Sequence, residues 1–331
     1  MVASQSRAEQ LRRRSIIWDN HACLPLRGLG DPSHLLARHR SAGMTFVSVN
    51  LGDAEVSLET MIRLAAHVRG FIDEHPREYV LARTAADITQ AKSDGRTAIA
   101  FDVEGLRVIG DQLSLVQLLY DIGVRWMSVA YNRANQAGGG CHDLHDNGLT
   151  PLGRGILAEL TRVGVVTCCS HTGFRTAREV IEQATVPVIF SHSNAGAIFE
   201  HPRNIPDDLA RRCAATGGVI GVNGLNIFLG QTGDLVDLLV AHLEHFIDIV
   251  GAQHVGLGLD FVYDNNELTE AVAAAEEIWP PGFGYGAGLR CVAPESLPRL
   301  TEALLARGHS DTTVAGILGE NFLRVARQVW R

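Results

Sequence analysis

The sequence contains no apolar run long enough to cross a lipid bilayer. No window of its 331 residues approaches the roughly 20 consecutive apolar residues that a membrane-spanning helix needs. The basic residues near the N-terminus are not followed by the apolar stretch of a secretory signal, because SIIW (15–18) leads at once into DNHAC (19–23). The C-terminal segment NFLRVARQVWR has the pattern of an amphipathic helix without a hydrophobic tail. We therefore expect a cytoplasmic protein that does not associate with membranes.

Positive charge and paired cysteines are also scarce. The chain has 29 Lys and Arg against 37 Asp and Glu, a formal net charge of -8, and its one dense basic run, Arg12 to Arg14, is better explained as a solvated lead-in. This balance argues against nucleic acid as a partner. The six cysteines, two of them adjacent at Cys168 and Cys169 in an apolar run, do not resemble a secreted disulfide framework, so reduced thiols are expected.

No linker rich in Pro, Gly or Ser and no shift in composition divides the chain. Hydrophobic residues make up 46% of it, enough to bury a sizeable core. Because α/β barrels often exceed the usual length of a domain, the sequence predicts a single domain over residues 1–331 that ends in the C-terminal helix.

Short strand-like runs alternate along the chain with segments of helical periodicity. This alternation predicts parallel pairing with right-handed crossovers. The predicted strands are 15–19, 44–50, 97–103, 125–131, 165–170, 187–191, 217–223 and 254–259, and the clearest helices are 57–75, 114–123, 153–164, 176–184, 206–217 and 235–251. Two long segments without clear regular structure, 132–150 and 262–292, are expected over the C-terminal face of a barrel, where active sites of this architecture lie.

Side chains that bind metals follow five of the strand-like runs. They are His21, Glu104, His171, His192 and Asp260. If the strands form one parallel barrel, these side chains point into a shared mouth, a pattern that favours a metallohydrolase.

The spacing of these residues favours a site for two ions. His21 and Cys23 are two apart, so both point to one face of a strand and can hold one ion. Glu104 has two oxygens and can bridge two ions, while His171 and His192 would complete the shell of the second. Asp260 can ligate weakly, or it can act as the acid/base that handles the proton of a bridging water.

Six segments together resemble the membrane dipeptidase (renal dipeptidase) family of binuclear zinc peptidases, in order and spacing and over nearly the whole chain. They are DNHACLP (19–25), DVEG (102–105), SHTG (170–173), FSHSNA (190–195), HPRNIPDD (201–208) and GLGLDF (256–261). The resemblance implies an amidohydrolase-like (β/α)₈ TIM barrel in which Glu104 and a hydroxide bridge two zinc ions. It also implies that His21, His171 and His192 are zinc ligands, that Asp260 is the catalytic aspartate, and that Arg203 binds the terminal carboxylate of a dipeptide. A homodimer is possible because family members commonly dimerise.

Two residues depart from the family pattern. Cys23 stands where the family has a carboxylate ligand, so it is either a thiolate ligand of the first ion or a neutral core cysteine beside a looser site. Tyr131 stands where many members have a histidine near the scissile bond, and it either donates a hydrogen bond to the developing oxyanion or packs the pocket rim.

The leading hypothesis is a zinc-dependent dipeptidase. Two alternatives remain: a hydrolase of another small amide, such as an N-acyl amino acid or a lactam, and a non-catalytic binding protein with a degraded metal site. Among weaker candidates, Cys168 and Cys169 are expected in the core, and Cys141, His142 and His145 form a possible extra metal site in a Gly-rich loop.

Overall fold

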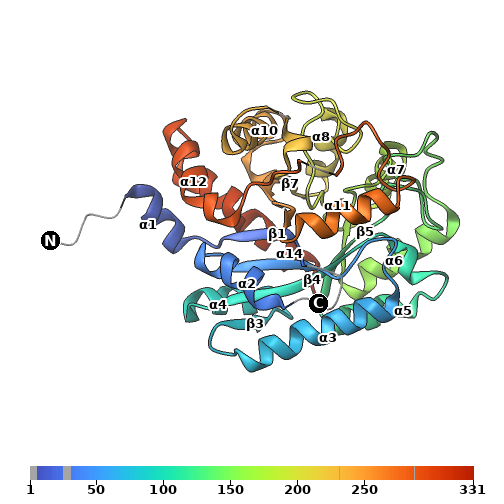
Figure 1. Ribbon diagram of the computed structural model, residues 1–331, viewed down its shortest axis with the longest axis horizontal. Helices are drawn as coiled ribbons and strands as arrows, with labels where there is room; N and C mark the ends of the chain where they lie inside the picture. The colour runs from blue at the N-terminus through green and yellow to red at the C-terminus, as the bar shows by residue number, and fades with distance from the viewer. Residues whose placement is uncertain (1–5, 25–30, 231, 287) are drawn as a thin grey trace.

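A computed structural model describes residues 6–24, 31–230, 232–286 and 288–331 (Figure 1). Pro25 of the first family segment therefore lies outside the described residues. The strands are β1 (Trp18–Cys23), β2 (Phe46–Asn50), β3 (Tyr79–Leu81), β4 (Thr97–Glu104), β5 (Val124–Ser128), β6 (Val166–Cys168), β7 (Ile220–Val222), β8 (Val255–Leu257) and β9 (Phe261–Val262). The helices are α1 (Arg7–Arg14), α2 (Pro32–Ser41), α3 (Leu58–Glu74), α4 (Ala85–Asp94), α5 (Ser114–Ile122), α6 (Pro151–Val163), α7 (Phe174–Gln183), α8 (Asp207–Ala215), α9 (Asn226–Leu229), α10 (Leu235–Val250), α11 (Asn265–Ala274), α12 (Leu297–Ala306), α13 (Asp311–Ala315) and α14 (Asn321–Val329).

The strands form the predicted parallel (β/α)₈ barrel. Parallel ladders join them in the order β6-β5-β4-β2-β1-β9, and β7 pairs with β8. Single parallel bridges, Cys168 to Ile189 and Phe190 to Ile220, connect β6 to β7 through residues 189–190. The segment 255–262 pairs with β7 at its start and with β1 at its end, so it closes the ring.

Several predicted strand bounds were wrong. The first strand begins at Trp18 and includes His21 and Cys23, because Ser15 ends α1 by bonding back to Leu11. Residues 187–191 make only the two bridges, since the backbone N–H groups of Ser191 and His192 donate to side chains instead of to a ladder. The short strand β3, which pairs with the start of β4, was not predicted.

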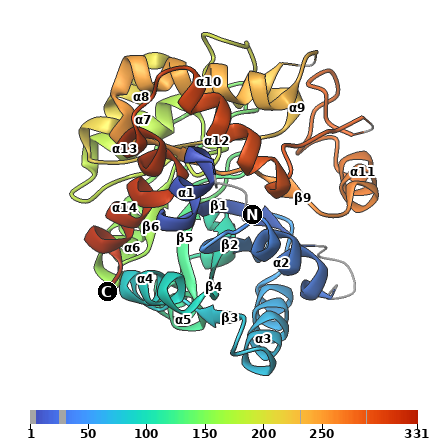
Figure 2. The same ribbon diagram turned by 90° about the vertical axis from the view of Figure 1, so that its left-hand side faces the viewer.

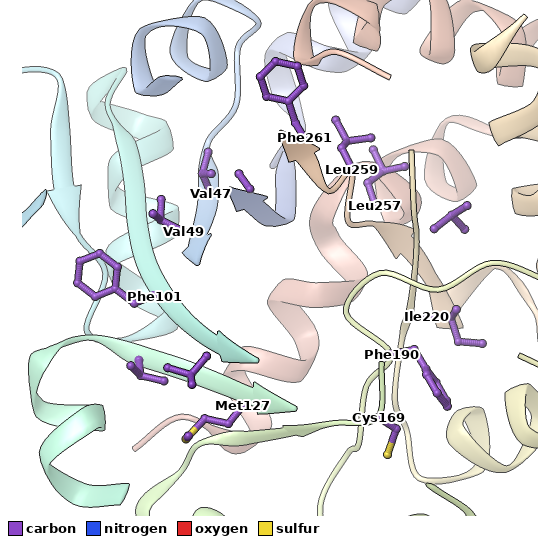
Figure 3. Packing of buried hydrophobic residues seen from close by; sticks show 14 of the residues in the cluster. Val47, Val49, Phe101, Met127, Cys169, Phe190, Ile220, Leu257, Leu259 and Phe261 are labelled. Atoms are coloured by element: carbon purple, nitrogen blue, oxygen red, sulfur yellow. The ribbon is translucent and has the colours of Figure 1, made fainter. Parts of the chain in front are cut away.

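Alternation along the strands separates two hydrophobic clusters. Side chains such as Val47, Val49 and Phe101 point outward and pack against the surrounding helices (Figure 3). The alternate side chains, such as Phe46 and Trp126, fill the barrel interior. Toward the C-terminal ends of the strands, the inward positions become polar.

The two ends of the barrel differ. At the N-terminal end, α14 contributes Phe322, Leu323 and Val329 to the interior cluster, and the Phe322 ring stacks on Trp18 with centroids 5.9 Å apart. Figure 2 shows α14 at one end of the molecule and α11 at the opposite end. The first end is thus closed by apolar packing, which leaves the C-terminal end for a polar site.

The two long segments meet over this C-terminal end. Segment 132–150 contains neither helix nor strand, as predicted, whereas 262–292 contains α11, which the sequence analysis missed. Arg133 donates to the carbonyl of Glu277, and the Nε2 of His142 lies 2.7 Å from the Tyr285 hydroxyl. No helix within the described ranges is long and apolar enough to span a membrane.

Candidate active site

Strands β1 and β4 place four site residues by their period of two. His21 and Cys23 share one face of β1, and Asp102 and Glu104 share one face of β4. The Nδ1–H of His21 donates to Oδ1 of Asp102 at 3.1 Å, which turns Nε2 toward the site. Ser48 and Asn50 also donate to Asp102. Asp102 was not predicted from the sequence, although its spacing of two from Glu104 was a usable signal.

His171 and His192 enter from the opposite side of the mouth. The Nδ1–H of His171 donates to Oδ1 of Asn132 at 2.7 Å, and Nδ1 of His192 lies 2.8 Å from the Ser191 hydroxyl. The two Nε2 atoms are 2.8 Å apart. Oε1 of Glu104 lies 3.0 Å from Nε2 of His171 and 3.2 Å from Nε2 of His192. Two imidazole nitrogens and a carboxylate oxygen therefore converge on one point.

The donor set fits a cation. Oε1 of Glu104 is buried and has no hydrogen-bond partner among the described residues. Burial lowers the pKa of His171 and of His192 well below the usual value, so both rings are neutral and can ligate. Burial raises the pKa of Glu104 to about 8. An ion at this point would stabilise the ionised carboxylate and would bind the Nε2 lone pairs of His171 and His192.

Cys23 and Asp260 lie on the His21 side of Glu104. The sulfur of Cys23 is 3.6 Å from Nε2 of His21 and 3.7 Å from Oδ1 of Asp260. Nε2 of His21 lies 3.6 Å from Oε2 of Glu104 and 3.6 Å from Oδ1 of Asp260. Burial raises the pKa of the Cys23 thiol to about 12. His21 belongs to two candidate metal groups, one with Cys23 and Asp260 and one with Glu104 and His192.

Arg203 and Tyr131 flank His171. The Nη2 of Arg203 lies 2.9 Å from Nε2 of His171, and its buried Nε has no partner within the described ranges. The ring of Tyr131 stacks on His171 with centroids 4.3 Å apart. Both side chains therefore border the point where the candidate metal-binding groups converge.

Backbone strain is concentrated at this site. Among the described non-glycine residues, only Asn132, His171 and Asp260 have positive φ, at 55°, 66° and 53°. Such a conformation is held only where surrounding contacts enforce it, and it clusters at functional sites. Asn132 holds His171, and Asn223 donates to Oδ2 of Asp260 at 2.8 Å. Neither asparagine was predicted, although Asn132 directly follows the predicted strand 125–131 and Asn223 ends the predicted strand 217–223.

The cysteines and histidines that were weaker candidates for metal binding form no metal site of their own among the described residues. Cys168 and Cys169 are buried, as expected of core residues. His142 contacts Tyr285, the sulfur of Cys141 lies 3.5 Å from Oδ1 of Asn132, and His145 is exposed. These three residues of the Gly-rich loop form no candidate metal group in the part of the chain that the structure describes.

The fold of this chain is similar to those of solved hydrolase structures. The chain is similar to an amidohydrolase from Pseudomonas aeruginosa, with 28% identity, a TM-score of 0.87 and coverage of 98% of this chain and 99% of the other. A metallo peptidase from Rhodobacter sphaeroides, liganded with a phosphinate mimic of the dipeptide L-Ala-D-Ala, shares the fold at 21% identity and a TM-score of 0.78, with 96% of this chain and 100% of the other covered. The protein is thus a barrel of the amidohydrolase type.

The family is narrower than this class. Residues 35–273 match the family described as membrane dipeptidase, peptidase family M19, and the chain belongs to that family. The chain is 30% identical to dipeptidase verJ of Clonostachys rogersoniana over 279 residues, which are 82% of this chain. It spans 66% of the length of that relative and 51% of a dipeptidase of Schizosaccharomyces pombe.

Proposed function

We propose that this protein is a metal-dependent dipeptidase that binds two zinc ions and hydrolyses the amide bond of dipeptides. The observation that carries the proposal is the convergence of Nε2 of His171, Nε2 of His192 and the otherwise unpartnered Oε1 of Glu104 at one buried point. Imidazole nitrogen and carboxylate oxygen are ordinary zinc donors.

The ligands divide between two positions. His21 and Cys23 would hold a first ion, His171 and His192 would hold a second, and the carboxylate of Glu104 would serve both. The distances support this division, because Oε2 of Glu104 faces His21 while Oε1 faces the other two imidazoles. When bound, the ions supply a nucleophilic hydroxide near neutral pH and polarise the amide carbonyl.

Three further side chains handle the substrate. Asp260, oriented by the amide of Asn223, accepts the proton of the attacking water and passes it to the leaving amine. The guanidinium of Arg203 pairs with the free carboxylate of the dipeptide. Burial raises the pKa of Tyr131 well above its usual value, so its phenol stays protonated and can donate to the developing oxyanion.

Metal content and chelation test this function. Purified protein should contain two zinc ions per chain by elemental analysis, and its dipeptide hydrolysis should disappear on dialysis against a chelator and return with zinc. A protein without metal and without turnover would favour the binding protein with a degraded site. A panel with D-residue dipeptides, N-acyl amino acids and lactams identifies the substrate class, and preference for the N-acyl or lactam substrates would contradict the dipeptidase assignment.

We also propose a cytoplasmic location and keep the homodimer as a prediction. All six cysteines are free, which suits a reducing compartment. Sedimentation at several protein concentrations would test the dimer.

A further inference from the structure

Two cavities of very different size open from the candidate metal site. One has a volume of about 350 Å³ and the other about 70 Å³, and both are lined by Cys23, Glu104 and Tyr131. Ligand pockets usually measure about 300–1,000 Å³. The first cavity therefore has room for a long side chain, whereas the second has little room beyond the reacting atoms.

The large cavity is walled on one side by α11 and the turn that follows it. Ala271, Ala274 and Ala275 line this cavity and not the small one, whereas Leu268 and Trp279 line both. Three alanines in this wall leave space where larger side chains would fill the cavity. Segment 262–292, predicted to lack regular structure, thus forms the wall of a pocket next to Glu104.

The small cavity is walled by larger apolar side chains. Leu225, Ile227 and Phe228 line it together with Tyr285 and Leu289. Phe228 and Leu225 are buried. They form one packed cluster with Ile227 and Leu289. This wall is held by its own packing and leaves only the small volume.

Arg203 shows which part of a dipeptide faces each cavity. Its Cζ lies 5.2 Å from the centroid of the Phe228 ring, and its Nη2 lies 2.9 Å from His171. Phe228 and His171 line the small cavity, and neither lines the large one. If Arg203 holds the terminal carboxylate, the second residue of the dipeptide lies at the small cavity and the first residue extends into the large one.

The negative charge of the large cavity should also select among first residues of the dipeptide by the charge of their side chains. Asp53, Glu55, Asp264 and Glu267 line it, and Glu55 is paired with Arg107 at 2.9 Å. The described lining residues include no Lys or Arg. Carboxylates at a partly apolar pocket repel an anionic side chain and attract an ammonium group.

We infer that this protein prefers dipeptides with a long apolar or cationic first residue and a glycine-sized second residue. This inference rests on the proposed function, because it uses Arg203 to set the direction of the substrate. It goes further by naming α11 as the specificity element for the first residue and the packed wall around Ile227 as the limit on the second.

Steady-state kinetics with zinc-loaded full-length protein tests the inference. The kcat/KM for Met-Gly should exceed that for Gly-Gly by about tenfold or more, because a buried methionine side chain contributes binding that glycine lacks. The kcat/KM for Gly-Met should be about tenfold lower than that for Gly-Gly, since overpacking a filled cavity is unfavourable. Lys-Gly should exceed Glu-Gly by about tenfold, in the direction that the carboxylates require.

A matched pair of variants on α11 locates the determinant. Ala271 lines the large cavity, whereas Ala273, on the same helix, is exposed and does not line it. Ala271→Phe should lower the ratio of kcat/KM for Met-Gly to kcat/KM for Gly-Gly about tenfold. Ala273→Phe should leave that ratio unchanged. Ile227→Ala should raise the ratio of Gly-Met to Gly-Gly several-fold. Each ratio is taken within one protein, so it does not depend on the folded fraction.

The outcomes separate the two proposals. An active enzyme with equal kcat/KM for Met-Gly and Gly-Met, or with equal ratios in the two phenylalanine variants, would overturn the pocket assignment and leave the dipeptidase function standing. A zinc-loaded protein that hydrolyses no dipeptide in the series would overturn the proposed function, and this inference with it.

Discussion

Replacing Glu104 with glutamine should abolish activity and metal binding while making the metal-free protein more stable. The carboxylate carries the negative charge between the two proposed ion positions, and a neutral amide cannot bridge two cations. Without metal, however, this carboxyl destabilises the fold, because burial beside the imidazole nitrogens of His171 and His192 makes it take up a proton at pH 7 that it would release in the unfolded chain. The amide N–H of glutamine can donate to one of these nitrogens.

The magnitude follows from the pKa of Glu104. Burial, partly opposed by His21, raises it from 4.5 to about 8. For a carboxyl whose folded pKa is raised, the destabilisation is absent below the unfolded pKa, grows as the pH rises and is complete above the folded pKa. At about 1.36 kcal/mol per pH unit, the interval from 4.5 to pH 7 corresponds to about 3 kcal/mol. For a chain of this length, that is roughly 4 °C in Tm.

Thermal melting with chelator and with zinc measures both effects. At pH 7 with chelator, Glu104→Gln should melt roughly 4 °C above the wild type, and the difference should shrink toward zero near pH 5. Zinc should raise the Tm of the wild type and not that of the variant. Glu302→Gln, an exposed change on α12, is the control and should match the wild type throughout. A chelated Glu104→Gln protein that melts below the chelated wild type, or that zinc stabilises as strongly, would refute the reasoning.

Three further substitutions test the roles of single residues. Arg203→Lys should raise KM about tenfold or more for dipeptides with a free carboxylate and much less for their amidated forms, because only a guanidinium fork engages both carboxylate oxygens; equal losses would make Arg203 structural. Asp260→Asn should keep its metal and lower kcat by about 10²–10⁴-fold, since a carboxamide accepts no proton, and parallel loss of both ions would make Asp260 mainly a ligand. Cys23→Ser should weaken zinc at the first position and Cys23→Asp should restore it, whereas a merely buried cysteine would tolerate Ser better than Asp. X-ray absorption decides the last case, because ligation requires a zinc–sulfur shell at about 2.3 Å.

Part of the candidate site was accessible from local pattern. Strand periodicity predicts that His21, Cys23 and Glu104 point toward one site. In the structure, the potential ligand atoms of His21, Glu104 and His192 lie within 4.8 Å of one another. Asp102 was open to the same reasoning, since it lies two residues before Glu104 on one strand. Asn132 and Asn223 also stand at the ends of predicted strands, but an asparagine there is not an ordinary metal ligand, and its role in orienting His171 or Asp260 depends on a contact with a distant segment. The roles assigned to all these residues remain predictions.

The sequence alone determined the alternation of strands and helices and the parallel pairing that follows from it, and it placed the candidate metal-binding side chains at the ends of strand-like runs; the barrel itself was implied by the family resemblance. These features depend on short-range periodicity, which a single segment already displays. Only the tertiary structure decided how 255–262 closes the ring between β7 and β1, and that α11 walls a large cavity while Ile227 and Phe228 restrict a small one. Closure and cavity volume depend on contacts between segments far apart in the chain, and no local pattern specifies the space left between them.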